Sequence, residues 1–195
     1  LDAIILYTAT TPQKKQENNR QLARQLSQIL LRHHLAEKYP SLPFWLKEGY
    51  GAMINPYPLP KNDELLIKAY QRNSLIPFEG LCRSFPKDTS GYALAEAQSI
   101  SFTHYLTQTQ GKQVIEKLIQ AYTQEGDCTL SFEKAVFIPL IQMEQRWLKD
   151  IIHKHYTTVE NQKFPLWILL STAITFIPIL LGILLRVSNT HLHNH

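Results

Sequence analysis

Residues 42–51 read Leu42-Pro43-Phe44-Trp45-Leu46-Lys47-Glu48-Gly49-Tyr50-Gly51, and the expected organisation of the chain depends on them. Proline cannot continue an α-helix, so Pro40 and Pro43 end the helix that precedes this stretch. The residues after Pro43 predict a second helix that carries one large aromatic side chain and one carboxylate. We expect Trp45 and Leu46 to pack in the core, which leaves Glu48 as the candidate functional residue of this stretch.

The rest of the chain predicts a series of helices behind one short strand. The apolar, β-branched run from Ala3 to Thr8 is typical of a strand. Apolar spacing and capping residues predict helices at 17–35, 44–54, 62–73, 92–108, 112–122 and 132–155, the last interrupted at Pro139, and a short helix with a turn within 77–86. The apolar positions of the first helix are Leu22, Leu26, Ile29 and Leu30. The expected fold class is mainly α, with an α+β remnant at the N-terminus.

Length and composition indicate one globular domain with an appendage. The chain has 195 residues, of which 44% are hydrophobic and 18% charged, and its formal net charge is +4. Basic residues gather near the N-terminus without interleaved aromatic residues, so we expect no nucleic-acid partner. Cys82 and Cys128 are the only cysteines, and they could form one disulfide or stay as two buried thiols.

The C-terminal part contains an apolar segment that predicts a membrane-spanning helix. Phe164 to Leu185 has no charged residue, and as a helix it would be about 33 Å long, close to the roughly 30 Å hydrocarbon core of a bilayer. The expected organisation is a domain at 1–155, a linker at 156–163, a transmembrane helix at 164–187 and a polar tail at 188–195. We therefore expect a single-pass protein anchored in the membrane through Phe164 to Val187, with the side that the domain faces left open.

Residues 42–51 resemble the "LPxWLxEGxA" segment of peptidase-MA-like domains, which belong to the gluzincin clan of metallopeptidases. Further stretches resemble the same family in the same order: Ile76 to Leu81, Tyr92 to Leu106, Ile115 to Ile119, Phe132 to Ala135 and Met143 to Trp147. The resemblance extends roughly from Ile4 to Leu148 and implies a zincin-like helical domain. The family carries more β structure ahead of its long helix, so we expect part of the domain to precede Leu1.

The resemblance implies that Glu48 is a zinc ligand if a His-Glu-x-x-His helix precedes it. The chain has no such motif, and in one register Arg20-Gln21-Leu22-Ala23-Arg24 stands in its place. Arginine offers no lone pair to a metal, and glutamine cannot take a proton from water. In this register we expect no catalytic residue, no metal ligand and no cofactor. Glu48 would instead be held by Arg20 and Arg24, whose charge replaces that of zinc.

A second register uses His33-His34-Leu35-Ala36-Glu37. His33, Glu37 and Glu48 would then form a zinc site with a non-standard ligand set, and the chain would be an active metallopeptidase. A third interpretation is a structural membrane protein that resembles the family in architecture only. The leading hypothesis is a membrane-anchored, catalytically inactive pseudopeptidase that binds a protein or peptide or serves as a scaffold, and whether it is an enzyme stays uncertain.

Overall fold

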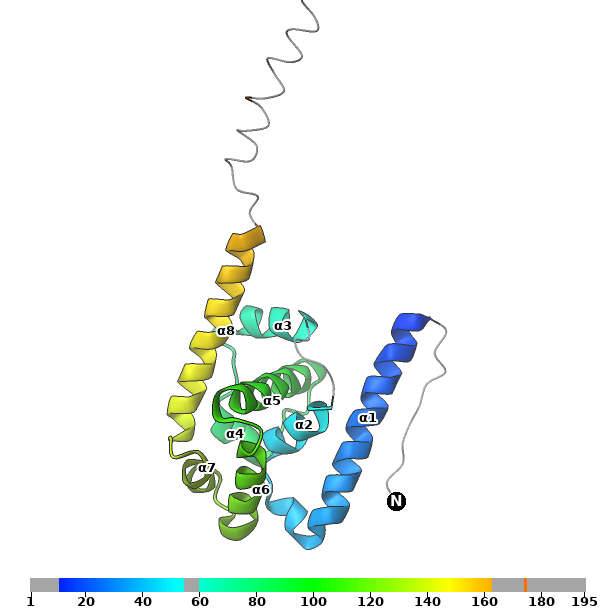
Figure 1. The fold of residues 1–195 in the computed structure, drawn as a ribbon, viewed down its shortest axis with the longest axis vertical. Helices are drawn as coiled ribbons and strands as arrows, with labels where there is room; N and C mark the ends of the chain where they lie inside the picture. The colour runs from blue at the N-terminus through cyan, green and yellow to red at the C-terminus, as the bar shows by residue number, and fades with distance from the viewer. Residues whose placement is uncertain (1–10, 55–59, 163–173, 175–195) are drawn as a thin grey trace, which may run out of the picture. The chain divides into compact units, whose positions relative to one another are not determined.

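The computed structural model describes residues 11–54, 60–162 and 174. The chain divides into two compact units, Leu1–Ile152 and His153–His195. The helices follow in the order α1 (Pro12–Leu35), the 3-10 helix η1 (Ala36–Ser41), α2 (Phe44–Ala52), α3 (Pro60–Gln71), α4 (Phe78–Arg83), α5 (Thr89–Gln110), α6 (Val114–Glu125), α7 (Cys128–Val136) and α8 (Leu140–Gln162). In the first unit, α5 lies in the middle and contacts α2, α3 and α6, while α1 contacts α2 (Figure 1).

The predicted fold class is wrong on its strand and on its membrane-spanning helix. The described residues contain no strand, and the run from Ala3 to Thr8 lies outside them. Thr11 caps α1 by accepting a hydrogen bond from the Lys14 amide, so α1 begins at Pro12, ahead of the helix predicted at 17–35.

No helix within 11–54 and 60–162 combines the length and the apolar character that a membrane span requires. The longest helix near the C-terminus, α8, buries Met143 and Trp147 but exposes Arg146 and Lys149. That pattern is typical of a helix that packs one face on a core. The segment 164–187, for which the spanning helix was predicted, lies outside the described residues except for Ile174.

An aromatic cluster forms the centre of the core, and Trp45 of α2 contacts several of its rings. The Trp45 side chain is completely buried. Its ring centroid lies 5.9 Å from that of Phe78, 5.3 Å from that of Phe102 and 6.2 Å from that of Phe132. These edge-to-face contacts favour ring packing beyond the area that is buried. The residue that anchors α2 therefore touches α4, α5 and α7 at once, as expected for a core tryptophan.

Two polar contacts fix α4 and the loop before it. The buried Gln98 of α5 accepts from the Ile76 amide at 2.9 Å and donates to the Ile76 carbonyl at 2.8 Å. Glu144 of α8 accepts from the amide of Phe78, the first residue of α4. Pro77 provides no side-chain cap for α4, so a carboxylate from a distant helix satisfies a free amide at this helix start.

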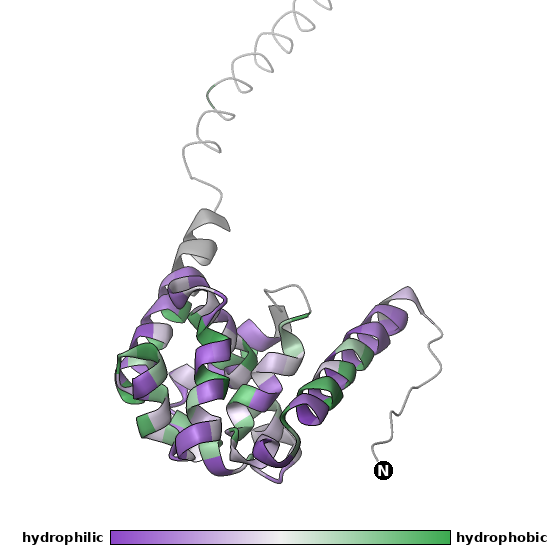
Figure 2. Cartoon of the chain, turned by 60° about the horizontal axis from the view of Figure 1, so that its bottom comes forward, coloured by the Kyte–Doolittle hydropathy of each residue, from purple (hydrophilic) through white to green (hydrophobic). Residues whose placement is uncertain are grey.

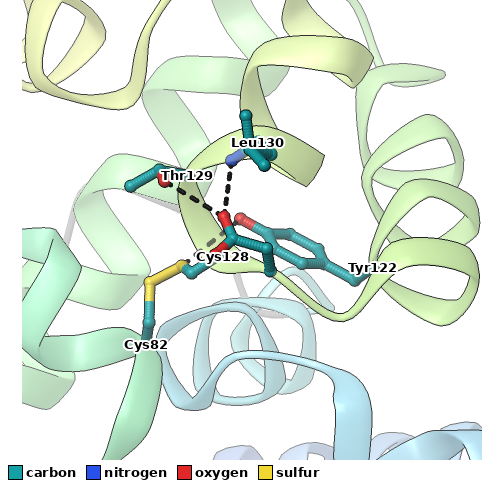
Figure 3. The surroundings of a disulfide bond; sticks show 6 residues. Cys82, Tyr122, Cys128, Thr129 and Leu130 are labelled. Atoms are coloured by element: carbon teal, nitrogen blue, oxygen red, sulfur yellow. Dashed lines mark hydrogen bonds between the residues drawn. A yellow bond between two sulfur atoms is a disulfide. The ribbon is translucent and has the colours of Figure 1, made fainter.

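A disulfide joins Cys82 of α4 to Cys128, the first residue of α7, with 6.1 Å between their Cα atoms. Asp127 caps α7 beside it by accepting from the Leu130 amide at 2.9 Å and from the Thr129 hydroxyl at 3.1 Å (Figure 3). Of the two states left open for the cysteines, the structure therefore has the bridged one.

Candidate functional site

The helix α1 turns a polar face towards the domain. Arg20, Arg24 and Gln28 recur at four-residue intervals, and all three are partly buried. Ser27 and Leu31, which share this side of the helix, are buried. The apolar positions that predicted this helix are therefore not the ones that it buries.

A three-residue ionic cluster connects α1, α2 and α5. The Arg24 guanidinium donates through Nη2 to Glu48 Oε2 and through Nη1 to Glu96 Oε1. The side chains of Arg24, Glu48 and Glu96 are 20%, 16% and 29% exposed, so water screens these pairs only in part. Gln28 adds a hydrogen bond from Nε2 to Glu48 Oε2 at 3.1 Å. Both carboxylates thus point at one planar cation, an arrangement that suits arginine better than lysine.

Two glycines let α2 approach its neighbours closely enough for this cluster to form. A Cβ atom on Gly49 would lie 1.8 Å from Thr103 Oγ1 and 2.8 Å from the Ser99 carbonyl oxygen, both on α5. A Cβ atom on Gly51 would lie 2.9 Å from Gln28 Cγ on α1. Because neither glycine carries a side chain, α2 can pack directly between α1 and α5. Glu48 is thereby brought into the cluster with Arg24 of α1 and Glu96 of α5.

Tyr92 lies at the edge of the ionic cluster, one turn before Glu96 on α5. Partial burial raises the pKa of the Tyr92 phenol above its usual value, and the negative charge of Glu48 raises it further, while Arg24 opposes the shift. The Tyr92 ring is 43% exposed and its centroid lies 5.5 Å from that of Phe85. The cluster therefore adjoins an accessible aromatic surface.

The site residues of the leading register lie on α1 and α2. The expected pair of Arg24 and Glu48 is present. Arg20 is partly buried one turn earlier on the same face of α1, and Gln21 is exposed. Arg24 has only donors and offers no lone pair to a metal ion, so it cannot act as a ligand where the resemblance has a histidine.

The alternative zinc ligands are not brought together. His33 and Glu37 are exposed at the end of α1 and in η1, whereas Glu48 is paired with Arg24. Across 11–54 and 60–162, no three side chains of His, Cys, Asp or Glu are grouped so that they could hold a metal ion. His33, Glu37 and Glu48 therefore do not form such a group.

Glu96, Tyr92 and Gln28 belong to the site but were not predicted to. Glu96 is 72 residues from Arg24, so no short motif could connect the two. The four-residue spacing of Tyr92 and Glu96 places them on one side of α5, but such a spacing is common on helix surfaces. Gln28 extends the spacing of Arg20 and Arg24 by one more turn, and this was the one signal available in the sequence.

Comparison of the chain with models of protein families, with curated proteins and with solved structures gave no match. A functional assignment therefore depends on the geometry around Arg24 and on the resemblance of residues 42–51.

Proposed function

We propose that the chain contains a catalytically inactive peptidase-MA-like domain that binds a protein or peptide partner. The observation that carries this proposal is the Arg24 guanidinium held between Glu48 and Glu96. In the zinc enzymes that residues 42–51 resemble, a metal ion neutralises the glutamate of this segment. Here a side chain supplies the positive charge, which keeps the architecture of the site and removes the means of activating water.

The surface beside the cluster supports a binding role. The rings of Phe44 and Phe85 lie 6.0 Å apart, and those of Phe85 and Tyr92 lie 5.5 Å apart. Phe44 is 42% exposed and Tyr92 is 43% exposed. The three rings form a row, here called the aromatic row, that leads to Glu48. Rigid aromatic side chains next to polar groups are typical of surfaces that bind extended peptides.

The first experiment measures metal content and stability together. Protein purified without chelators should contain far less than one zinc ion per chain. Arg24→Ala should lower the free energy of unfolding by about 1–3 kcal/mol, because it leaves two partly buried carboxylates without their cation. Arg24→Lys should have a free energy of unfolding between those of the parent chain and Arg24→Ala. Lysine keeps the positive charge but lacks the planar group that can donate to both carboxylates. Lys15→Ala, which removes an exposed cation from the same helix, should change stability by less than about 0.5 kcal/mol.

One tightly bound zinc ion per chain that is lost in Glu48→Ala would overturn the proposal of an inactive domain. The binding role has a separate test, in which a random peptide library is selected on the immobilised full chain. Peptides retained by the aromatic row should lose binding in Tyr92→Ser but keep it in Leu130→Ser, which removes a 62% exposed apolar side chain from α7. Equal binding to both variants would contradict a role for the aromatic row.

A further inference from the structure

The disulfide between Cys82 and Cys128 lies in the wall of a pocket. The pocket has a volume of about 200 Å³, and its lining includes both cysteines and the charged residues Glu79, Arg83 and Asp127. Both cysteines are partly exposed, so a molecule in the pocket has a route to the bond between them. Pockets for drug-sized ligands measure roughly 300–1,000 Å³, so this one suits a smaller molecule.

The side chains around the bond carry a net negative charge. Hydrophilic residues recur along the helices of the first unit (Figure 2), and at the pocket they include the acidic Glu79 and Asp127 and the basic Arg83, all exposed. Hydrogen bonds to its carboxyl hold the pKa of Asp127 below its usual value, and the charge of Arg83 contributes to the same shift. Arg83 therefore offsets part of the acidic charge, and the remainder favours a molecule with a positive group over one with a negative group.

The two sulfur atoms differ in how well each can carry a negative charge. Cys128 is the first residue of α7, where free backbone amides and the helix dipole stabilise an anion. Cys82 lies in the last turn of α4, where free carbonyl groups disfavour one. Asp127 and Arg83 act on their neighbouring cysteines in the opposite direction, but both are exposed, so water and salt screen their charges. In thiol exchange the sulfur that forms the more stable thiolate leaves faster.

Tyr122 of α6 places a hydrogen-bond donor beside Cys128 (Figure 3). Its hydroxyl oxygen lies 3.8 Å from Cys128 Sγ, and its side chain is 1% exposed. Burial raises the pKa of the Tyr122 phenol well above its usual value, so the hydroxyl stays protonated and can donate to a thiolate. The phenol and the start of α7 thus favour the same sulfur as the leaving group.

We propose that this disulfide is an exchange site for a small aminothiol, which enters the pocket and attacks Cys82. The aminothiol, as its thiolate, bonds to Cys82 Sγ, and the bond between the two cysteine sulfur atoms breaks with its electron pair leaving on Cys128 Sγ. One disulfide is exchanged for another, so this step consumes no oxidant or reductant. The proposal depends on the pocket and the bond, and it does not depend on the proposed function.

A second aminothiol completes the reduction of the bond. Its thiolate attacks the sulfur of the bound aminothiol, which releases Cys82 as a thiolate and joins the two aminothiols in a disulfide. The two cysteine thiolates take up the protons that the two aminothiols released. The protein disulfide is thereby reduced, and two aminothiols are oxidised.

Exchange at this bond removes a link between two helices that support the aromatic core. Phe78 belongs to α4 and Phe132 belongs to α7, and the rings of both contact Trp45 of α2. The covalent link lies at the end of α4 and at the start of α7. The chemical state of the pocket therefore affects how firmly α4 and α7 are held against the helix that carries Glu48.

The first test locates the adduct on the full chain. The oxidised chain is incubated with cysteamine, acid stops the exchange by protonating the thiolates, and the peptides from a pepsin digest are quantified by mass spectrometry. The ratio of adduct on Cys82 to adduct on Cys128 should be about tenfold higher in the folded chain than in the same chain unfolded in urea. A ratio in the folded chain that is equal to or lower than that in urea, or adducts that form only in urea, would overturn the proposal.

The second test measures the charge preference of the pocket. At low salt and equal thiolate concentration, the yield of the cysteamine adduct relative to that of the mercaptoethanesulfonate adduct should be about fivefold higher in the folded chain than in urea. Glu79→Gln removes a carboxylate from the pocket lining and should bring this preference to within about twofold of the value in urea. The matched control is Glu116→Gln, which removes an exposed carboxylate of α6 that does not line the pocket, and it should leave the preference unchanged. The same preference in the folded and unfolded chains, or the same response to both variants, would reject the aminothiol as the molecule that this pocket takes.

Discussion

Replacing Gly49 by alanine should separate α2 from α5 and destabilise the domain strongly. The new Cβ atom would lie 1.8 Å from Thr103 Oγ1, 2.7 Å from Thr103 Cβ and 2.8 Å from the Ser99 carbonyl oxygen. Thr103 is completely buried, so its side chain has no free volume to turn into. The Ser99 contact involves backbone, so rotation of a side chain cannot relieve it.

The size of the effect follows from the displacement that the methyl group requires. A normal carbon–oxygen contact is about 3.5 Å, so α2 must move away from α5 by more than an ångström, or both helices must distort. Overpacking of this kind costs about 1–3 kcal/mol, and we expect the upper end because two contacts involve atoms that cannot yield. For a domain of this size, about 3 kcal/mol corresponds to a melting temperature lower by about 10 °C.

The assay is thermal unfolding monitored by circular dichroism, with Gly80→Ala as the matched control. Gly80 is also helical, but its Cβ atom would have only Ile76 Cγ2 as a neighbour, at 3.9 Å. Alanine there should stabilise by about 0.5–1 kcal/mol, because it removes the backbone entropy of glycine. If Gly49→Ala melts within about 2 °C of the parent chain, α2 and α5 are not in the direct contact that brings Glu48 to Arg24.

Three further predictions concern a crosslink, a proton and a backbone angle. Replacing Cys82 and Cys128 by serine opens a loop with a sequence separation of 46 and should lower the free energy of unfolding by about 4 kcal/mol; an unchanged midpoint in urea would contradict this. Burial raises the pKa of the Glu144 carboxyl above its usual value, against the opposing effect of the hydrogen bond from the Phe78 amide. The stability that protonated Glu144 contributes is fully present below pH 4.5 and is lost as the pH rises through the raised pKa. Glu144→Gln should therefore flatten the dependence of melting temperature on pH between about 4 and 7, and parallel curves for parent and variant would reject the shift. Phe137 has a φ of 59° and is 85% exposed. A positive φ is strained for a residue with a side chain, so Phe137→Gly should raise the free energy of unfolding by up to about 1 kcal/mol, measured by thermal unfolding. A loss of stability would show that the phenylalanine ring makes a stabilising contact.

Features that depend on neighbouring residues were predictable from the sequence. Asp88 accepts from the Gly91 amide at 2.7 Å and caps α5. Gly126 ends α6 with a φ of 74°, which glycine adopts at little cost. The interruption expected near Pro139 separates α7 from α8. In each case one or two residues determine the local backbone, so a short window of sequence carries the signal.

Features that depend on distant residues were not predictable in the same way. Leu22 and Leu26 have the spacing of a buried stripe, yet the domain receives the opposite face of α1, because Arg24 meets a carboxylate on each of two other helices. Glu96 had no local pattern to distinguish it from an ordinary surface glutamate. The state of Cys82 and Cys128 depends on how α4 and α7 pack, which a count of cysteines does not reveal. Periodicity identified the helix but did not identify its buried side.

The disulfide between Cys82 and Cys128 also determines how a cut chain would behave. Both α5 and α6, with the turn at Gly111 between them, lie inside the loop that this bond closes. A protease that cleaves at this turn would produce two pieces that remain covalently joined. The nicked protein would migrate as one species without reductant and as two with it. The central helix and its partner are thus retained even after the backbone between them is broken.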